Sequence, residues 1–331
     1  MTAREHRGSG EDNLIARYFR PLATDAGALG LIDDVALLAA TNQNLVVTTD
    51  AIVEGVHFLP DDPAETIARK ALRVNLSDIA AKGAVPAGFV LTLALRDASE
   101  AWLAPFAKAL GEDAAAFDCP LLGGDTVSTP GPLMISITAF GHVPVGQMVH
   151  RAGAKAGDRI VVTGTIGDAA LGLKVLRGDI PRESLDAPSR EQLVQRYRVP
   201  QPRNAIALAV RDHATAAMDV SDGLAGDLAK LCAASGVSAT IDVPAIPLSE
   251  PARTMLAEAQ VSLENVVAGG DDYEVLCTVP EDRWDAFYAA ALKANTLVTS
   301  IGRVVTGQTP PRFVDGNGNP VVLKRLSYSH F

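Results

Sequence analysis

The sequence has few cysteines and few basic side chains, and each shortage excludes a class of protein. Its three cysteines, Cys119, Cys232 and Cys277, show no C-x-x-C spacing, which suits neither a disulfide framework nor a zinc cage. The 29 lysines and arginines are outnumbered by 39 aspartates and glutamates, which leaves a net charge of −10. A surface that binds nucleic acid phosphates needs the opposite balance, so we expect no nucleic acid partner.

Long apolar runs are also absent. The longest apolar stretch, Gly83 to Leu95, lies between Lys82 and Arg96 and falls short of the roughly 20 residues that a membrane helix needs. It predicts a buried strand instead. The first residues, MTAREHRGSGEDN, are polar and contain no apolar core of a signal peptide. With scattered cysteines that suit a reducing compartment, these absences predict a cytoplasmic protein without a membrane partner.

The apolar content is sufficient for two folded domains. Hydrophobic residues make up 48% of the 331 residues, a length that corresponds to roughly two domains. Both halves alternate helical and strand patterns, so the predicted fold class is α+β, with α/β-like alternation. In the first half, the strand patterns cover 45–52, 87–95, 120–127 and 133–141, and the helical patterns cover 63–82 and 98–117.

A turn-rich passage, HRAGAKAGD at 150–158, precedes an apolar strand pattern at 159–163. We place the domain boundary there, which gives domains of residues 1–152 and 153–331. The second half continues with helical patterns from 168, at 204–212, 222–235 and 281–293, and with strand patterns ending at 220 and covering 238–243, 273–279 and 298–304. The segment 307–320 is rich in turn residues and predicts a loop.

Short acidic motifs recur along the chain. Taken singly, each is more easily interpreted as a helix cap or a turn, because Asp and Ser cap helices and Gly-Asp forms turns. Their recurrence in one acidic protein, mostly after apolar runs, favours clustered carboxylates at strand ends. The motifs are Asp33-Asp34, Thr48-Thr49-Asp50, Asn75-Leu76-Ser77-Asp78, Gly123-Gly124-Asp125-Thr126 and Asp219-Val220-Ser221-Asp222-Gly223.

Oxygen ligands without His or Cys suit Mg²⁺, so these motifs predict a magnesium site. Magnesium also reconciles a net charge of −10 with phosphate binding, because divalent cations can bridge carboxylates and phosphates. The sequence has no G-x-x-x-x-G-K-[ST] loop and no H-R-D or D-F-G motif, which excludes P-loop enzymes and protein kinases.

Three further features each have two interpretations. The turn at 163–172, TGTIGDAALG, could bind an anion at a helix N-terminus, although such turns are common. Arg151, in a basic patch with His150 and Lys155, could bind phosphate or be a solvated hinge residue. His57 could contact a substrate or be a packed structural imidazole.

In their order along the chain, these motifs resemble the thiamine-monophosphate kinase family, within the superfamily that includes aminoimidazole ribonucleotide synthetase and selenophosphate synthetase. The resemblance covers nearly the whole chain, and the order of NLSD, GGDT and D-x-S-D-G-L is highly specific. It is carried by GEDNLIARYF at 10–19, IDDVALL, TTDAIVEGVHF, KALRVNLSDIAAKGAVP, LLGGDT, HRAGAKAGD, DVSDGL, GGDDYEV and the terminal YSHF.

The resemblance implies direct transfer of the γ-phosphoryl group of ATP to thiamine monophosphate, giving thiamine diphosphate and ADP with several Mg²⁺ ions. It implies an N-terminal α/β domain that binds ATP and Mg²⁺ and pairs across a homodimer to build a barrel. The C-terminal α+β domain, of the aminoimidazole ribonucleotide synthetase type, would close the active site.

The family motifs also assign roles to residues. The implied metal ligands are Asp34, Thr48, Thr49, Asp50, Asp78, Asp125, Asp219 and Asp222. The implied ATP contacts are Gly124, Asp125, Arg151 and Ser221, and the implied thiamine phosphate contacts are His57, Asp271 and Tyr328. Two positions depart from the family pattern, since Ile32 replaces a glycine and Asp271 replaces a glutamate.

Other activities remain as alternatives. A selenophosphate synthetase would need a reactive cysteine near the N-terminus, whereas the first cysteine here is Cys119. The hydrogenase-maturation relative depends on a C-terminal cysteine, whereas this chain ends in His330-Phe331. Outside the superfamily, a metal-dependent phosphatase and a catalytically silent nucleotide-binding protein remain. Formation of ADP that depends on thiamine monophosphate distinguishes the kinase from the phosphatase and from the silent protein.

Overall fold

The computed structural model describes residues 13–33 and 35–327, so the predictions for Asp34 and Tyr328 lie outside the described residues. The chain divides into two compact units. The first contains residues 1–75 and 86–142, and the second contains residues 76–85 and 143–331. Helix α2 (Ala64–Ala81) therefore begins in the first unit and ends in the second. The domain boundary at 152/153 stays a prediction, because the two units are not separated by a single cut in the chain.

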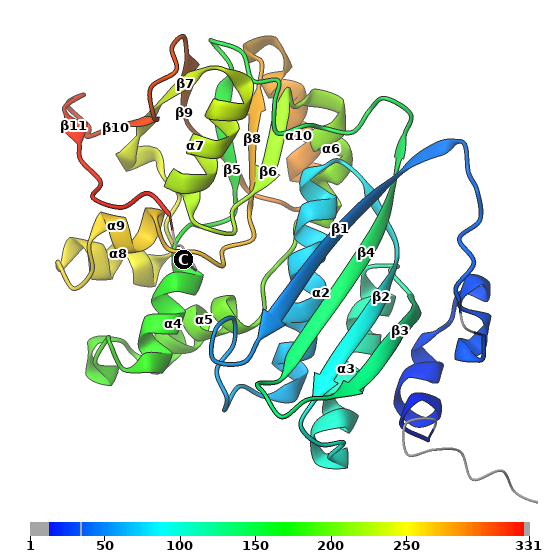
Figure 1. Cartoon of the computed structure of the whole chain (residues 1–331). Helices are drawn as coiled ribbons and strands as arrows, with labels where there is room; N and C mark the ends of the chain where they lie inside the picture. Colours follow the sequence, from blue (N-terminus) through cyan, green and yellow to red (C-terminus); the bar gives the residue numbers. More distant parts are fainter. Residues whose placement is uncertain (1–12, 34, 328–331) are drawn as a thin grey trace, which may run out of the picture. The chain divides into compact units, whose positions relative to one another are not determined.

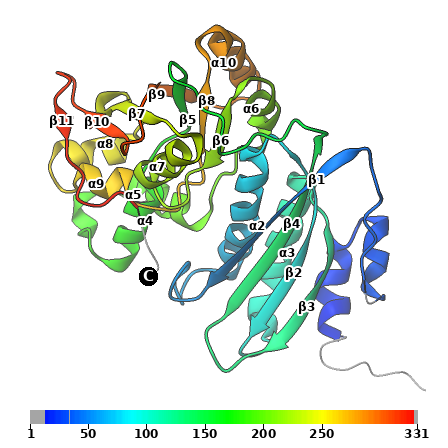
Figure 2. The same ribbon diagram turned by 45° about the horizontal axis from the view of Figure 1, so that its top comes forward.

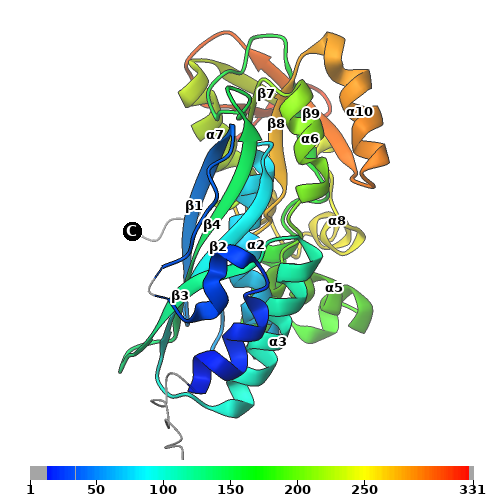
Figure 3. The same cartoon turned by 90° about the vertical axis from the view of Figure 1, so that its right-hand side faces the viewer.

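The first unit is built on a four-stranded sheet with the strand order β1-β4-β2-β3. Strands β2 and β3 are parallel and place Thr92 opposite Asp125. Helices α2 and α3 lie on the same face of this sheet (Figure 1 and Figure 3). The strands are β1 (Gln43–Val53), β2 (Val85–Leu95), β3 (Leu121–Ser128) and β4 (Met134–Pro144), and α3 covers Glu100–Ala116.

Alternating burial along β4 shows how this sheet is oriented. Ile135, Ile137 and Ala139 are buried, whereas the residues between them are only half-buried. The residues of one face thus belong to the core, as expected for a strand with a period of two. On the edge strand β1, Leu45 and Val47 are 45% and 55% exposed. The sheet therefore keeps apolar side chains outside the core of this unit.

The second unit contains a seven-stranded sheet with the order β11-β10-β7-β9-β5-β8-β6. Its interior strand β5 has three consecutive apolar residues, and alternate residues enter two different cores. Ile160 and Val162 pack in one hydrophobic cluster, whereas Val161 packs in another with Phe287. The strands are β5 (Arg159–Thr163), β6 (Ala216–Asp219), β7 (Ser238–Asp242), β8 (Val275–Val279), β9 (Val298–Val305), β10 (Arg312–Val314) and β11 (Pro320–Val321).

Helices cover both faces of the second sheet. Helix α7 lies on one face, and α6 and α10 lie on the other (Figure 2 and Figure 3). In the described part of the chain, no helix is both long and apolar enough to cross a membrane. The helices are α4 (Asp168–Arg177), α5 (Ala187–Arg198), α6 (Ala207–His213), α7 (Leu224–Ser235), α8 (Glu250–Ala257), α9 (Leu263–Val267) and α10 (Trp284–Lys293).

The structure confirms the strands and helices predicted for both halves and corrects two segments. The predicted loop at 307–320 is wrong in part, because β10 lies within it and pairs in parallel with β7. The strand predicted from Tyr273 begins only at Val275, because Asp271 and Tyr273 have positive φ angles. Helix α5 was missed, although Asp186 caps it by accepting the N–H of Ser189 at 2.8 Å.

Candidate active site

Most of the acidic motifs lie in regular secondary structure. Thr48 to Asp50 lie within β1, and Gly124 and Asp125 lie within β3, so the turn interpretation of Gly-Asp is wrong here. Asp78 lies in the last turn of α2. The negative end of the helix dipole disfavours a carboxylate at that place. Capping of this helix therefore does not explain Asp78.

In the first unit, Gly124 and Asp125 line a cavity of about 300 Å³. Its apolar wall includes Phe19 and Leu31 from the N-terminal turns of the chain. A Cβ atom on Gly124 would overlap the backbone carbonyl oxygen of Leu91, so glycine is required for the close pairing of β2 and β3. Asp125 is exposed beside this cavity and can receive a ligand from solvent.

The predicted ligands on β1 are held by neighbouring elements. The hydroxyl of Thr49 donates to the carbonyl oxygen of Ile137 at 3.2 Å and accepts from the hydroxyl of Thr138 at 3.0 Å. The backbone N–H of Asp50 donates to the side-chain oxygen of Asn75 at 3.1 Å. Asn75 of the NLSD motif thus fixes β1 to α2, while the residue Asp50 itself remains exposed.

His57 lies in the tight loop after β1 and is held at two atoms. The backbone N–H of Val53 donates to its Nδ1 at 3.1 Å, and the ammonium of Lys70 donates to its carbonyl oxygen at 2.8 Å. An Nδ1 that accepts a hydrogen bond assigns the proton of the neutral ring to Nε2. Lys70 is only 1% exposed, and sequence reasoning missed it because a lone helical lysine usually faces solvent.

In the second unit, the DVSDGL motif does not cap its helix. The N-cap of α7 is Gly223, without a side-chain cap, so the capping interpretation of Ser221 and Asp222 is wrong. Instead, the carboxylate of Asp227 accepts the backbone N–H groups of Ser221 at 3.0 Å and Asp222 at 2.9 Å. Lys230 forms ion pairs with both Asp222 and Asp227. The carboxylate of Asp222 is therefore paired with a lysine ammonium group.

Lys82 brings three predicted residues into one electrostatic neighbourhood. Its ammonium donates to the carbonyl oxygen of Ala217 at 2.7 Å. Burial lowers the pKa of Lys82, Asp219 and Asp78 oppose that shift, and Arg151 adds to it. Asp78, Asp219 and Arg151 come from three separate segments, yet all act on this one ammonium group. In the sequence, Lys82 appears only as the charged residue that precedes an apolar stretch.

The GGDD segment is joined to the DVSDGL motif. The backbone N–H of Asp271 donates to the carbonyl oxygen of Ser221 at 2.8 Å. A Cβ atom on Gly270 would lie 2.6 Å from the same oxygen, so the two segments meet closely. The hydroxyl of Tyr273 donates to Oδ1 of Asp271 at 3.3 Å. Two predicted site residues, Ser221 and Asp271, are therefore neighbours in the structure.

The predicted ligands have the chemistry that Mg²⁺ prefers. All the predicted ligand atoms are carboxylate or hydroxyl oxygens, which fits this ion. Among residues 13–33 and 35–327, no group of three or more His, Cys, Asp and Glu side chains could hold a metal ion. Magnesium is usually bound by one or two carboxylates together with water and substrate phosphates, so a preformed protein cage is not required.

Comparison with known proteins identifies the family. The models for the N-terminal and C-terminal domains of AIR synthase related proteins match residues 32–143 and 155–314. The thiamine-monophosphate kinase of Caulobacter vibrioides is 43% identical over 323 residues, covering 96% of this chain and 89% of the relative. The chain belongs to the thiamine-monophosphate kinase family. It is accordingly an enzyme, a phosphotransferase of the thiamine-phosphate kinase class.

Other members of the thiamine-monophosphate kinase family agree with this assignment. The Escherichia coli K12 enzyme is 42% identical over 327 residues and is covered to 98%. The crystal structure of the Stenotrophomonas maltophilia K279a enzyme superposes with a TM-score of 0.82 at 39% identity, covering 94% of this chain and 96% of that one. The predicted α+β fold of the aminoimidazole ribonucleotide synthetase type is thereby confirmed.

Proposed function

We propose that the enzyme transfers the terminal phosphoryl group of ATP directly to thiamine monophosphate, giving thiamine diphosphate and ADP. The observation that carries this proposal is the placement of Asp78, Asp125 and Asp222, whose positions neither helix capping nor turn formation explains. A structure described as AaThiL complexed with AMPPCP and TMP supports both substrates, with 30% identity, a TM-score of 0.77 and coverage of 90% of this chain and 91% of that chain.

The residues whose oxygen atoms suit Mg²⁺ are the ones that would hold this ion. When bound, magnesium would neutralise phosphate charge, which is the main requirement of phosphoryl transfer. The assignment of Asp34 rests on the family resemblance, because this residue lies outside the described part of the chain. In the first unit the ligands would be Thr48, Thr49, Asp50 and Asp125, and in the second unit Asp78, Asp219 and Asp222.

The remaining groups of the site would bind and orient ATP. Arg151 is exposed, and its guanidinium can form paired hydrogen bonds to phosphate oxygens. Ser221 would supply further polar contact, and Gly124 would allow close approach of the nucleotide to the backbone. The acceptor is a phosphate monoester with a second pKa of about 6, so it is mostly a dianion at pH 7. No strong general base and no covalent enzyme intermediate are therefore needed for in-line transfer.

His57 and Asp271 would bind thiamine monophosphate. The proton on Nε2 of His57 can be donated to the substrate, because Nδ1 accepts the N–H of Val53. The carboxylate of Asp271 would face the cationic thiamine moiety. Tyr328 would contribute an aromatic contact, and this assignment rests on the terminal YSHF motif alone.

Asp271→Ala should raise KM for thiamine monophosphate much more than KM for ATP, whereas Asp271→Glu should be tolerated. A tenfold rise corresponds to about 1.4 kcal/mol of lost binding. Initial rates with each substrate varied in turn give the two Michaelis constants. Equal changes in both constants, or no change in either, would remove Asp271 from the substrate site.

The enzyme would also form a homodimer through the first unit. Leu45 and Val47 lie two residues apart on the edge strand β1, so they point to one face, and both are largely exposed. Exposed apolar side chains on a sheet are typical of an interaction surface. Sedimentation analysis should show a dimer for the wild-type protein and a monomer for Val47→Lys. A wild-type monomer would contradict this part of the proposal.

The decisive experiment uses purified protein with ATP, Mg²⁺ and thiamine monophosphate, followed by chromatography of nucleotides and thiamine phosphates. We expect ADP and thiamine diphosphate to form only when both Mg²⁺ and thiamine monophosphate are present. Free thiamine should be a poor acceptor because it lacks the anionic nucleophile. Equal or faster turnover with thiamine would overturn the proposal. Release of inorganic phosphate without thiamine diphosphate indicates a phosphatase, and nucleotide binding without turnover indicates a silent protein.

A further inference from the structure

The segment Gly269–Glu274 has an unusual backbone. Asp271 and Tyr273 have φ angles of +72° and +51°. Positive φ is uncommon for residues other than glycine, and it is rare for a bulky residue such as tyrosine. Such conformations persist only where the surrounding structure enforces them, and they concentrate at functional sites. The residue between them, Asp272, makes the first contacts that hold this backbone in place.

Asp272 is fully buried, and both of its carboxylate oxygens lie 2.9 Å from the backbone nitrogen of Gly167. Gly167 is the N-cap residue of α4 and has a φ of +89°. In the TGTIGDAALG turn, the backbone N–H of Gly167 could bind an external anion, but it already donates to the carboxylate of Asp272. A Cβ atom on Gly167 would lie 2.5 Å from the side chain of Val266, so glycine is needed here.

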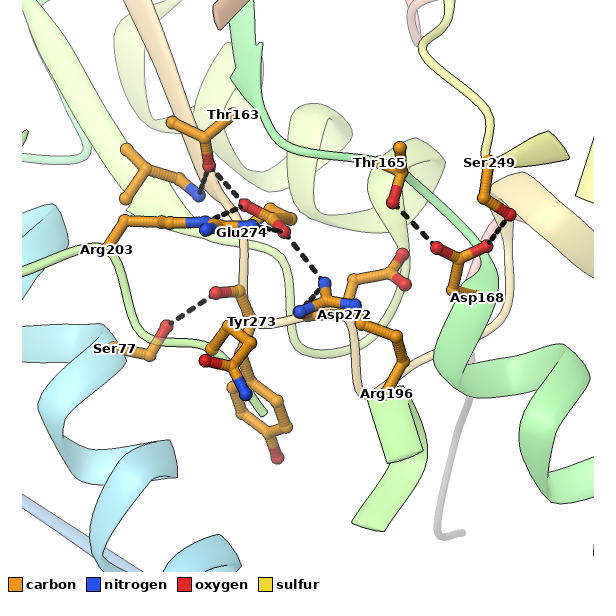
Figure 4. A network of polar contacts seen from close by, with 12 residues as sticks. Ser77, Thr163, Thr165, Asp168, Arg196, Arg203, Ser249, Asp272, Tyr273 and Glu274 are labelled. Atoms are coloured by element: carbon orange, nitrogen blue, oxygen red, sulfur yellow. Dashed lines mark hydrogen bonds and ion pairs between the residues drawn. The ribbon is translucent and has the colours of Figure 1, made fainter. Parts of the chain in front are cut away.

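A second set of contacts holds the other end of the segment (Figure 4). Glu274 is fully buried and accepts from Arg196 at 2.7 Å, from Nε of Arg203 at 2.6 Å and from the hydroxyl of Thr163 at 2.5 Å. Arg196 also donates to the backbone carbonyl oxygen of Asp272 at 3.2 Å. One guanidinium therefore joins the carboxylate of Glu274 to the backbone of Asp272.

We propose that Asp272 and Tyr273 are positioning residues that fix the direction of the Asp271 carboxylate toward thiamine monophosphate. Asp272 would act on the backbone, through Gly167 and Arg196. Tyr273 would act on the side chain, because its hydroxyl donates to Oδ1 of Asp271 at 3.3 Å. This inference rests on the proposed function, in which Asp271 faces the substrate.

The length of the Asp271 side chain explains why such positioning matters. An aspartate has one methylene between its backbone and its carboxylate, so the φ angle of Asp271 largely determines where the carboxylate points. A loop released from Asp272 would relax toward negative φ and turn the carboxylate away. The backbone N–H of Tyr273, which donates to the carbonyl oxygen of Val220 at 2.8 Å, fixes the segment from the side of β6.

Tyr273→Phe tests the side-chain contact, because it removes only one hydroxyl group. We expect KM for thiamine monophosphate to rise about fivefold, as for the loss of one hydrogen bond of ordinary net strength, with KM for ATP unchanged and kcat within about twofold. In an Asp271→Ala background, the same substitution should have no further effect. A rise in KM that persists in that background would show that Tyr273 does not act through Asp271.

Asp272→Asn tests the backbone contact and keeps one oxygen for the amide of Gly167. KM for thiamine monophosphate should rise by about tenfold more than KM for ATP, because a small displacement of a binding group is costly. The matched control is Asp113→Asn in the first unit, where Asp113 is 1% exposed and accepts from Nε of Arg73 at 2.6 Å. That variant likewise replaces a buried, hydrogen-bonded carboxyl group by an amide, and it should lower Tm without changing the ratio of the two KM values.

These outcomes separate the inference from the proposed function. A wild-type protein that forms no ADP in response to thiamine monophosphate would overturn both. An active wild-type enzyme whose Tyr273→Phe and Asp272→Asn variants change both KM values equally, or neither, would overturn only the positioning role. If Asp272→Asn fails to fold by circular dichroism, the Tyr273→Phe series alone decides the result.

Discussion

Two pairs of carboxylates, one pair in each unit, have opposite surroundings. Asp50 and Asp125 of the first unit are exposed residues on strands. Asp272 and Glu274 of the second unit are completely buried, and each accepts hydrogen bonds from within the same unit. Buried charges must be paired, whereas exposed oxygens remain accessible to external cations. The comparison teaches that the same residue type serves two purposes, since the exposed pair can receive a cation from solvent whereas the buried pair holds the substrate loop.

Removing the buried network should have the largest effect. Glu274→Ala leaves the guanidinium groups of Arg196 and Arg203 without their carboxylate, which should lower the free energy of unfolding by about 3 to 5 kcal/mol. Urea denaturation followed by circular dichroism measures this loss. The control is Glu112→Ala, because the side chain of Glu112 is 49% exposed and its ion pair with Arg69 should contribute less than about 1 kcal/mol. Equal losses in the two variants would contradict the comparison.

Removing an exposed carboxylate should affect catalysis instead of stability. Asp125→Asn should lower kcat by more than about tenfold, because it removes charge from a metal site, while Tm stays close to that of the wild-type protein. The half-buried Asp78 and Asp222 should show a similar loss of kcat when changed to asparagine. Steady-state rates and thermal denaturation on the same samples check both properties. Reduced Tm with unchanged activity per folded molecule would make these residues structural.

The pH dependence of stability sharpens the comparison further. Complete burial raises the pKa of Asp272 well above its usual range, against the opposing hydrogen bond from Gly167. The folded state thus keeps a proton that the unfolded chain loses near pH 3.9, so this contribution is full below that pH and is lost as pH rises through the folded pKa. The Tm of the wild-type protein minus that of Asp272→Asn should therefore fall as the pH is raised above about 4. A constant difference would mean that Asp272 stays ionised in the fold.

The smallest effect is expected when the native protein is treated with a thiol reagent. Labelling of the buried cysteines tests whether the cores of both units exclude the reagent. Burial raises the pKa of Cys119 and of Cys277 to about 12, and that of Cys232 to about 11. Since the thiolate is the reactive form, iodoacetamide at pH 8 should leave the native enzyme unlabelled and active. Mass spectrometry should find all three thiols labelled only after denaturation. Rapid labelling of one thiol in the native protein would show that its core opens.

Much of the fold could be predicted from the sequence because the relevant patterns are local. The alternation along β4 and the apolar run of β5 occur within single segments, and each indicates a strand with one or two buried faces. Short elements were less predictable. Strand β10 has three residues, and its pairing with β7 depends on a segment far away in the chain.

The sequence also determined which chemistry is available. The motifs NLSD, GGDT and DVSDGL contain the oxygen donors, and their order indicates the family. Each of these motifs is a short segment that can be read directly from the sequence. Sequence reasoning did not reveal the partners that orient these segments, such as Lys82 at Ala217 or Asp227 at the backbone of Ser221. Those contacts depend on the three-dimensional fold, since a buried lysine and a flanking lysine look alike in a sequence.

Asp271 and Asp272 show where sequence information ends. They are adjacent residues of the same type, and the family pattern singles out only the first. The sequence determined that two carboxylates stand beside two glycines. Only the tertiary structure decided that Asp272 turns inward to the amide of Gly167, 105 residues away in the chain, while Asp271 adopts a positive φ and stays half-buried. The physical reason is that a buried carboxylate needs a donor, and folding determines which donor is within reach.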